Sequence, residues 1–222
     1  MNVSNHLPQV TTFLNKYSES TINSPETHFF GVFDGHAGGR CSKAIATSIP
    51  EQLIKDPNFS TKLSVALKSS ISRANEQFLK VAEKLRLHDG STGICCLLRE
   101  NKLIVGNVGD SRAILLSGGK AIQLSTDHKP SNPEEQRRIA ALGGTVIQCM
   151  GIARVNGILA VARAFGNYGL RHVIKADPDI FQRELGTDDD YIVLGSDGLV
   201  SKPLSRRVIC FAIYSGQPLF YV

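Results

Sequence analysis

Three aspartates follow apolar segments of the sequence, and each lies beside a glycine. Asp34 and Asp197 come directly after such a segment, and Asp110 lies two residues beyond another. We expect these carboxylates at the ends of sheet strands, where they repel one another unless a cation neutralises them. Oxygen ligands without cysteine or paired histidine favour Mg²⁺ or Mn²⁺ over Zn²⁺. The pattern predicts a carboxylate-held metal site with His36 beside it, although each aspartate and glycine, taken singly, is more typical of a turn.

The rest of the sequence alternates predicted strands with two predicted helices. Apolar residues recur every three to four positions from 60 to 86, the spacing of an amphipathic helix. Asn132, followed by Pro133 and two glutamates, predicts the start of a second helix, which Gly143 and Gly144 end. Short separations between the apolar segments predict antiparallel neighbours. We expect strands at 28–33, 92–98, 103–108, 113–116, 121–124, 159–163 and 191–196.

Composition excludes several classes of protein. The chain has 222 residues, of which 42% are hydrophobic and 20% charged, and no stretch approaches the about 18 apolar residues of a membrane span. The net charge of +5 is spread along the chain without interleaved aromatics, which argues against nucleic-acid binding. The first eight residues lack the features of a secretory signal, and the five cysteines lack metal-ligand spacing. We therefore expect reduced thiols and a cytoplasmic or nuclear location.

Several motifs occur in the order found in one enzyme family. They are FGVFDGHAGG at 30–39, GST at 90–92, NVGDSRA at 107–113, DHKP at 127–130, ARAFG at 162–166 and LGSDGL at 194–199. Together they resemble the metal-dependent PPM-type protein phosphatases, the protein phosphatase 2C family. The resemblance implies an α+β fold, an α-β-β-α sandwich of two antiparallel sheets flanked by helices. It covers 28–200, leaving divergent segments at 1–27 and 201–222, so we expect a domain incomplete at both termini.

The resemblance also implies a mechanism and its residues. Such enzymes hydrolyse phosphoserine and phosphothreonine with two Mg²⁺ or Mn²⁺ ions that bind the phosphate and activate water. Asp34 resembles the carboxylate that bridges the two metals, Gly35 the residue that offers its carbonyl, and Asp197 a ligand of the second metal. Asp110 matches a position associated with a third, weaker site. His36 is similar to the proposed general acid. The implied partners are phosphorylated proteins, bound by a monomer, and the substrate-binding residues are not assigned.

The sequence departs from the family pattern at several positions. An arginine and an acidic group expected upstream of Asp34 are absent, Ser201 stands where a second aspartate is expected, and Val200 replaces a tryptophan. Asn167 occupies the place of an aspartate. Fewer carboxylates should weaken metal binding, so we expect impaired hydrolysis. One alternative is a catalytically weak or inactive truncated form that binds phosphoproteins or partners. Another is that the ends are artefacts of gene modelling, and the abrupt divergence after Leu199 favours an altered exon or a frameshift over gradual drift.

The segment 127–157 resembles the irregular region that shapes substrate access in such enzymes. It contains Arg137, Arg138 and Arg154. These arginines could meet the charge of a phosphopeptide, but a solvated helix face explains the first two equally well.

Overall fold

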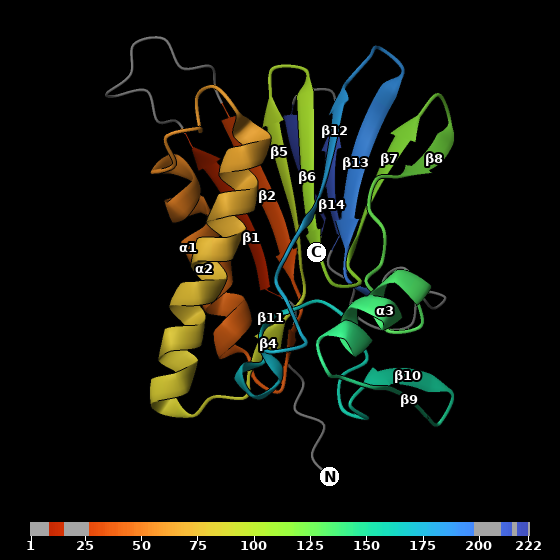
Figure 1. Cartoon of the computed structure of the whole chain (residues 1–222). Helices are drawn as coiled ribbons and strands as arrows, with labels where there is room; N and C mark the ends of the chain where they lie inside the picture. The colour runs from red at the N-terminus through yellow and green to blue at the C-terminus, as the bar shows by residue number, and fades with distance from the viewer. Residues whose placement is uncertain (1–8, 16–26, 198–209, 215–216, 222) are drawn as a thin grey trace.

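A computed structural model describes residues 9–15, 27–197, 210–214 and 217–221, with side chains for 27–197. Its main feature is a pair of five-stranded antiparallel sheets (Figure 1). The first sheet has the order β1 (Gln9–Asn15), β2 (Thr27–Phe33), β5 (Gly93–Arg99), β6 (Lys102–Val108) and β12 (Asp179–Glu184). The second has the order β15 (Gln217–Tyr221), β14 (Cys210–Tyr214), β13 (Asp189–Gly195), β7 (Arg112–Ser117) and β8 (Lys120–Gln123). The α+β class that the sequence predicts is confirmed.

Two small sheets complete the described strands. One has the order β11 (Phe165–Gly166), β4 (Gly90–Ser91) and β3 (Gly35–His36), and the other is a hairpin of β9 (Val146–Cys149) and β10 (Ile152–Val155). The first of these lies where β2 ends, because β3 follows β2 after the single residue Asp34. It therefore forms part of the surroundings of the predicted site.

The central strands are buried on both faces, because alternate side chains enter two different cores. In β2, Phe29 and Phe33 pack on the side of the helices, whereas Phe30 and Val32 pack between the sheets. Residues of β7 and β13 close the second core from the other sheet; they are Ala113, Leu115, Ile192 and Leu194. This layering explains why these strands read as continuous apolar runs instead of alternating ones.

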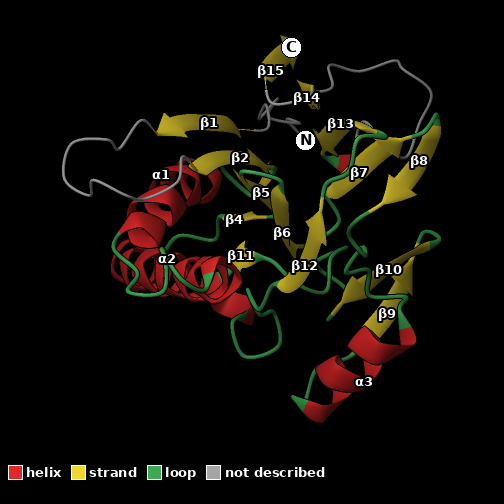
Figure 2. Ribbon diagram, turned by 90° about the horizontal axis from the view of Figure 1, so that it is seen from above, coloured by secondary structure: helices red, strands yellow, loops and turns green. Residues whose placement is uncertain are grey.

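Two long helices cover the outer face of the first sheet. They are α1 (Arg40–Ile54) and α2 (Leu63–Leu85), which pack on each other and on β2 and β6 (Figure 2). The third helix, α3 (Pro133–Ala141), instead packs against β9, apart from the two long helices. A short 3₁₀ helix, η1 (Tyr168–Leu170), contacts α2. None of the helices among the described residues is long and apolar enough to cross a membrane.

The structure corrects the sequence reading at several elements, and the strands β9, β10 and β12 are not among those predicted. Helix α1 is not among the predicted helices, although its buried residues Cys41, Ile45, Ile49 and Leu53 recur every four positions. The strand predicted at 159–163 does not form, because this stretch makes only isolated bridges at its two ends. The helix predicted at 60–86 begins three residues later, after a turn in which the amide of Lys62 donates to the carbonyl of Asn58.

The N-terminal segment contributes β1 to the first sheet, and the C-terminal segment contributes β14 and β15 to the second. Backbone pairing joins β1 to β2, and β14 to β13, in antiparallel register. The substitutions noted at Val200 and Ser201 lie outside the described residues. The domain boundaries after residues 27 and 200 stay a prediction.

Candidate functional site

The predicted site residues come from the ends of strands in both large sheets. Asp34 joins β2 to β3, and Asp110 lies in the turn between β6 and β7. Asp197 follows β13, which pairs with β7 across the second sheet. Asp110 is buried, with 7% of its surface exposed, whereas Asp197 is exposed. The fold therefore brings to one region three carboxylates that are up to 163 residues apart in sequence.

The three carboxylates influence one another electrostatically. Burial, followed by the charges of Asp197 and Asp110, raises the pKa of Asp34 to about 6. Burial also raises the pKa of Asp110, and the ammonium of Lys129, which forms an ion pair with it, offsets this effect only in part. Desolvated carboxylates that repel one another favour a nearby cation, because the cation stabilises their charged forms. The donor chemistry of this region thus fits a hard divalent metal.

In the described residues, however, no three His, Cys, Asp or Glu side chains approach closely enough to form a metal cluster. Asp110 instead has Lys129 as its partner, and the next cation along the chain, Arg112, binds Asp127 through both carboxylate oxygens, at 2.7 and 2.9 Å. Of the three site carboxylates, Asp110 thus has a cationic side chain, that of Lys129, as its partner. The fit rests on the type of donor and on the mutual repulsion of the carboxylates.

His36, two residues after Asp34 in the sequence, is held by Asn167. Its Nε2 is 2.9 Å from the side-chain oxygen of Asn167, a residue in the left-handed backbone region with φ of 46°. Burial lowers the pKa of His36, and the contact with Asn167 and the charges of Asp110 and Asp89 offset this only in part. Gly90 permits the contact, because a Cβ at this position would lie 2.2 Å from the Asn167 oxygen and 2.3 Å from His36 Nε2.

The sequence reading missed Asp89, a buried carboxylate next to this pair. Its carboxylate accepts a hydrogen bond from the backbone amide of Arg40 at 3.0 Å and another from the guanidinium of Arg40 at 2.6 Å. Asp89 therefore anchors the first turn of α1. Burial alone would raise the pKa of Asp89, but the hydrogen bonds from Arg40 outweigh it and hold the pKa below its usual value. The available signal was the pair Asp89 and Gly90, which resembles the other aspartate and glycine pairs.

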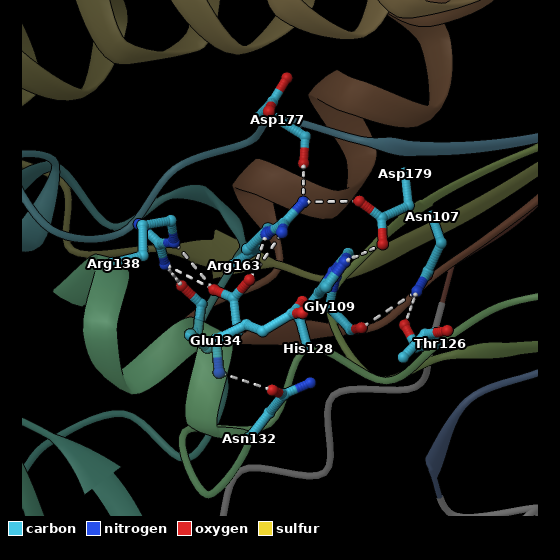
Figure 3. Close-up of polar contacts among 12 residues, drawn as sticks. Asn107, Gly109, Thr126, His128, Asn132, Glu134, Arg138, Arg163, Asp177 and Asp179 are labelled. Carbon is cyan, nitrogen blue, oxygen red and sulfur yellow. Dashed lines mark hydrogen bonds and ion pairs between the residues drawn. The ribbon is translucent and has the colours of Figure 1, made fainter.

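A network of charged side chains links the DHKP motif to α3 (Figure 3). Glu135 of α3 accepts hydrogen bonds from Arg138 at 2.8 Å and from Arg163 at 2.6 Å. Arg163 also donates to Asp179 of β12 at 2.8 Å, and Asp179 lies 3.1 Å from Nε2 of His128. Arg138 is therefore an internal ion-pair partner. The sequence offers two explanations for Arg138, binding of phosphopeptide charge and a position on a solvated helix face. The structure supports neither of them.

Comparison with known proteins settles the family. The family model described as protein phosphatase 2C matches residues 5–215, nearly the whole chain. The chain belongs to the protein phosphatase 2C family. The family model extends on both sides beyond the segment 28–200 that carries the recognised motifs.

Curated members of the protein phosphatase 2C family are similar to the chain over most of its length. "Probable protein phosphatase 2C 76" of Arabidopsis thaliana is 41% identical over 199 residues, which cover 90% of this chain and 47% of that protein. "Probable protein phosphatase 2C 52" of Oryza sativa subsp. japonica is 40% identical over 180 residues, which cover 81% of this chain and 36% of that protein. The chain thus spans less than half the length of these two relatives.

Solved structures give the same fold. A Caenorhabditis elegans sex determining protein superposes with a TM-score of 0.79 at 28% identity, covering 87% of this chain and 48% of that one. Serine-threonine phosphatase 2C from Toxoplasma gondii superposes with a TM-score of 0.73 over 78% of this chain and 69% of its own. At 24% identity, this second likeness supports the fold alone.

Proposed function

We propose that this chain carries the site of a protein serine/threonine phosphatase that uses Mg²⁺ or Mn²⁺. The observation that supports it most is that Asp34, Asp110 and Asp197 act on one another in a member of the protein phosphatase 2C family: burial first, and then the charges of Asp197 and Asp110, raise the pKa of Asp34. These carboxylates and the carbonyl of Gly35 are the donors that we propose for two metal ions and a third, weaker one. When bound, the metals supply positive charge for the phosphate oxygens and activate the attacking water.

In this proposal His36 is the general acid. An amide oxygen can only accept a hydrogen bond, so the contact with Asn167 places a proton on Nε2 of His36. The imidazole is half-buried and held by its contact with Asn167. In its imidazolium form the ring would keep the Nε2 proton on Asn167 and would donate its second proton, from Nδ1, to the departing serine or threonine oxygen.

We further infer that the chain turns over slowly. Ser201 stands where the family pattern has a second aspartate. A serine hydroxyl is a neutral ligand, whereas an aspartate supplies an anionic oxygen to the metal. With fewer carboxylates the metal is held more weakly, so hydrolysis should need a high Mn²⁺ concentration.

Phosphorylated proteins are the substrates that this proposal implies, with the chain acting as a monomer in the cytoplasm or nucleus. These assignments follow from the family's chemistry and from the sequence expectations.

The direct test is hydrolysis of p-nitrophenyl phosphate and of a phosphoserine peptide, with Mn²⁺ and with a chelator. We expect slow turnover that needs Mn²⁺ and that Asp34→Ala abolishes. Turnover that is unaffected by the chelator or by Asp34→Ala would contradict the proposed site. Turnover equal to that of the Arabidopsis relative would contradict the inference of slow hydrolysis. Peptide binding without hydrolysis at any Mn²⁺ concentration would support a binding role instead.

A further inference from the structure

We propose that His128 is a positioning residue that fixes the turn carrying Asp110 and ties this turn to α3. The inference deepens the proposed function and rests on it, since Asp110 matters as a metal ligand only in a metal-dependent phosphatase. It starts from the contacts that surround His128, which is 2% exposed.

One side of His128 holds the backbone of the turn. The amide of Gly109 donates to Nδ1 of His128 at 3.0 Å, and the amide of His128 donates to the carbonyl of Gly109 at 2.9 Å. The same carbonyl accepts from the side chain of Asn107 at 3.2 Å. Both backbone groups of Gly109 are thus satisfied within the buried interior, as buried polar groups require.

The turn needs this support because its backbone is unusual. Gly109 has φ of 110°, in the region that favours glycine, and a Cβ there would lie 2.6 Å from Cβ of Thr92. The next residue is Asp110, whose carboxylate pairs with Lys129, the neighbour of His128. One residue of the DHKP motif therefore holds the backbone of the turn, and the next holds its carboxylate.

The other side of His128 faces the charged network. Its Nε2 lies 3.1 Å from Asp179, which continues through Arg163 to Glu135, a residue of α3 that is only 3% exposed. The carbonyl of His128 also accepts from the amide of Ala162 at 2.8 Å, and Arg138 donates to the carbonyl of Ala162 at 2.7 Å. The path through Asp179 is half exposed, whereas the path through Ala162 is buried. A displacement of α3 would therefore reach the Asp110 turn along both paths.

The ring chemistry fixes the form of His128. Nδ1 can accept from Gly109 only when it is unprotonated, so the neutral ring carries its proton on Nε2, facing Asp179. Burial and the charge of Arg163 lower the pKa of His128, which agrees with a neutral ring. A histidine that merely filled space in the core would not need this tautomer.

Two substitutions separate the two sides of the ring. In His128→Asn, the amide oxygen stands near the place of Nδ1 and can still accept from Gly109, but the contact with Asp179 is lost. In His128→Gln, the longer side chain can still reach Asp179, but the acceptor for Gly109 is lost. Glu134→Gln is a matched control, because Glu134 is exposed on α3 next to Glu135 and its side chain lies outside the network.

The test uses NMR on the whole chain. In the wild type we expect a scalar coupling between the amide nitrogen of Gly109 and Nδ1 of His128, transmitted through their hydrogen bond. We also expect the neutral ring of His128 to carry its proton on Nε2. Amide exchange at Gly109 should be on the order of tenfold faster in His128→Gln than in His128→Asn, the value for loss of one buried hydrogen bond. The Glu134→Gln control should match the wild type.

Absence of the wild-type coupling, or equal exchange at Gly109 in the two variants, would overturn the inference. If a variant fails to fold, the coupling between Gly109 and His128 and the tautomer of His128, both measured in the wild type, test the inference without the variants. Where Mn²⁺-dependent turnover is measurable, kcat should fall further in His128→Gln than in His128→Asn, with KM little changed, and equal kcat values would contradict positioning. Lack of turnover in the wild type would count against the proposed function. Amide exchange at Gly109 and the coupling between Gly109 and His128 test the role of His128 independently of turnover.

Discussion

Two groups of carboxylates among the described residues differ in how their charge is compensated. Asp56, Asp89 and Glu135 each bind an arginine, and hydrogen bonds outweigh burial, so that the pKa of each lies below its usual value. Asp34 and Asp110 have raised pKa values instead. Carboxylates of the first group stabilise the fold. In the second group burial outweighs any compensation, including that of Lys129 at Asp110, and carboxylates perturbed in this way are typical of functional sites.

Asp56 provides a test of the stabilising group. Its side chain is 2% exposed and accepts from Ser69 at 2.6 Å, from the amide of Asn58 at 2.9 Å and from Arg73 at 2.7 Å. Asp56→Ala should lower the free energy of unfolding by about 2 to 3 kcal/mol, because it leaves these donors unpaired. Asp177→Ala removes an exposed ion pair with Lys68 and should cost less than about 1 kcal/mol. Urea denaturation measures both, and equal losses would contradict this assignment.

The same residue predicts a pH dependence. Burial would raise the pKa of Asp56, but its hydrogen bonds outweigh this and lower it. A carboxylate with a depressed pKa in the folded state stabilises the protein above its unfolded pKa of about 3.9, and this contribution is lost as pH falls through the folded value. Below about pH 4, the stability difference between wild type and Asp56→Ala should therefore narrow. If urea denaturation gives the same difference in unfolding free energy between wild type and Asp56→Ala down to pH 2, the depressed pKa of Asp56 is contradicted.

At the scale of elements, the sequence predicts helices best where periodicity and end signals agree. In α3, Asn132 caps the helix, with its side chain accepting from the amide of Glu134 at 2.9 Å, and the helix ends at Ala141 before Gly143. In α1 the apolar period is present, but Gly38 and Gly39 precede it and Pro50 interrupts it. A segment with such weak local helix signals forms a helix only when it packs on α2 and β2. The sequence alone does not reveal this packing.

The cap of α3 can be measured directly. Asn132→Ala should lower the free energy of unfolding by about 1 kcal/mol, because it removes the acceptor for the amide of Glu134. Ser131→Ala, at the exposed residue just before the cap, is the control and should change it by less than about 0.5 kcal/mol. If urea denaturation gives the same value for both variants, the side chain of Asn132 does not act as a cap.

The failed strand at 159–163 has a specific cause. Its last residue, Arg163, points into the charged network with Glu135 and Asp179, and the amide of Ala162 donates to the carbonyl of His128. These partners are 16 to 34 residues away in the sequence, so local composition does not reveal them. An apolar run alone could not separate a strand from a linker that is fixed by long-range contacts.

At the scale of the whole molecule, two cores share the strands of the first sheet. Cys95 packs on the helix side of β5 and Cys96 packs between the sheets, so neighbouring residues belong to different cores. Both side chains are buried. Burial raises the pKa of Cys96 to about 12 and that of Cys95 further.

Thiol reactivity should report this layering. Iodoacetamide at pH 8 should modify Cys149, which is half-buried at the end of β9, much faster than Cys95 or Cys96. Thiols without access to solvent and with a raised pKa form little thiolate. Peptide mapping by mass spectrometry before and after unfolding measures the rates. Modification of Cys95 or Cys96 at the rate of Cys149 in the folded protein would contradict the layered arrangement.

The strand-end position of the candidate site could be predicted from sequence, but its surroundings could not. Asp34, Asp110 and Asp197 were predicted at strand ends, and the structure places them there with mutual electrostatic influence. The contact of His36 with Asn167 spans 131 residues and depends on Gly90, so no local motif announces it. The same is true of the network around His128.

The central claim is that Asp34 and its neighbours bind a divalent metal, and calorimetric titration with Mn²⁺ tests it most directly. Asp188→Asn is the matched control, because Asp188 is exposed in the turn before β13. We predict that wild type and Asp188→Asn bind Mn²⁺ alike, whereas Asp34→Asn lowers the affinity at least about tenfold, the minimum cost of disturbing a metal site. Equal Mn²⁺ affinity in wild type and Asp34→Asn, or no binding to wild type, would contradict the claim.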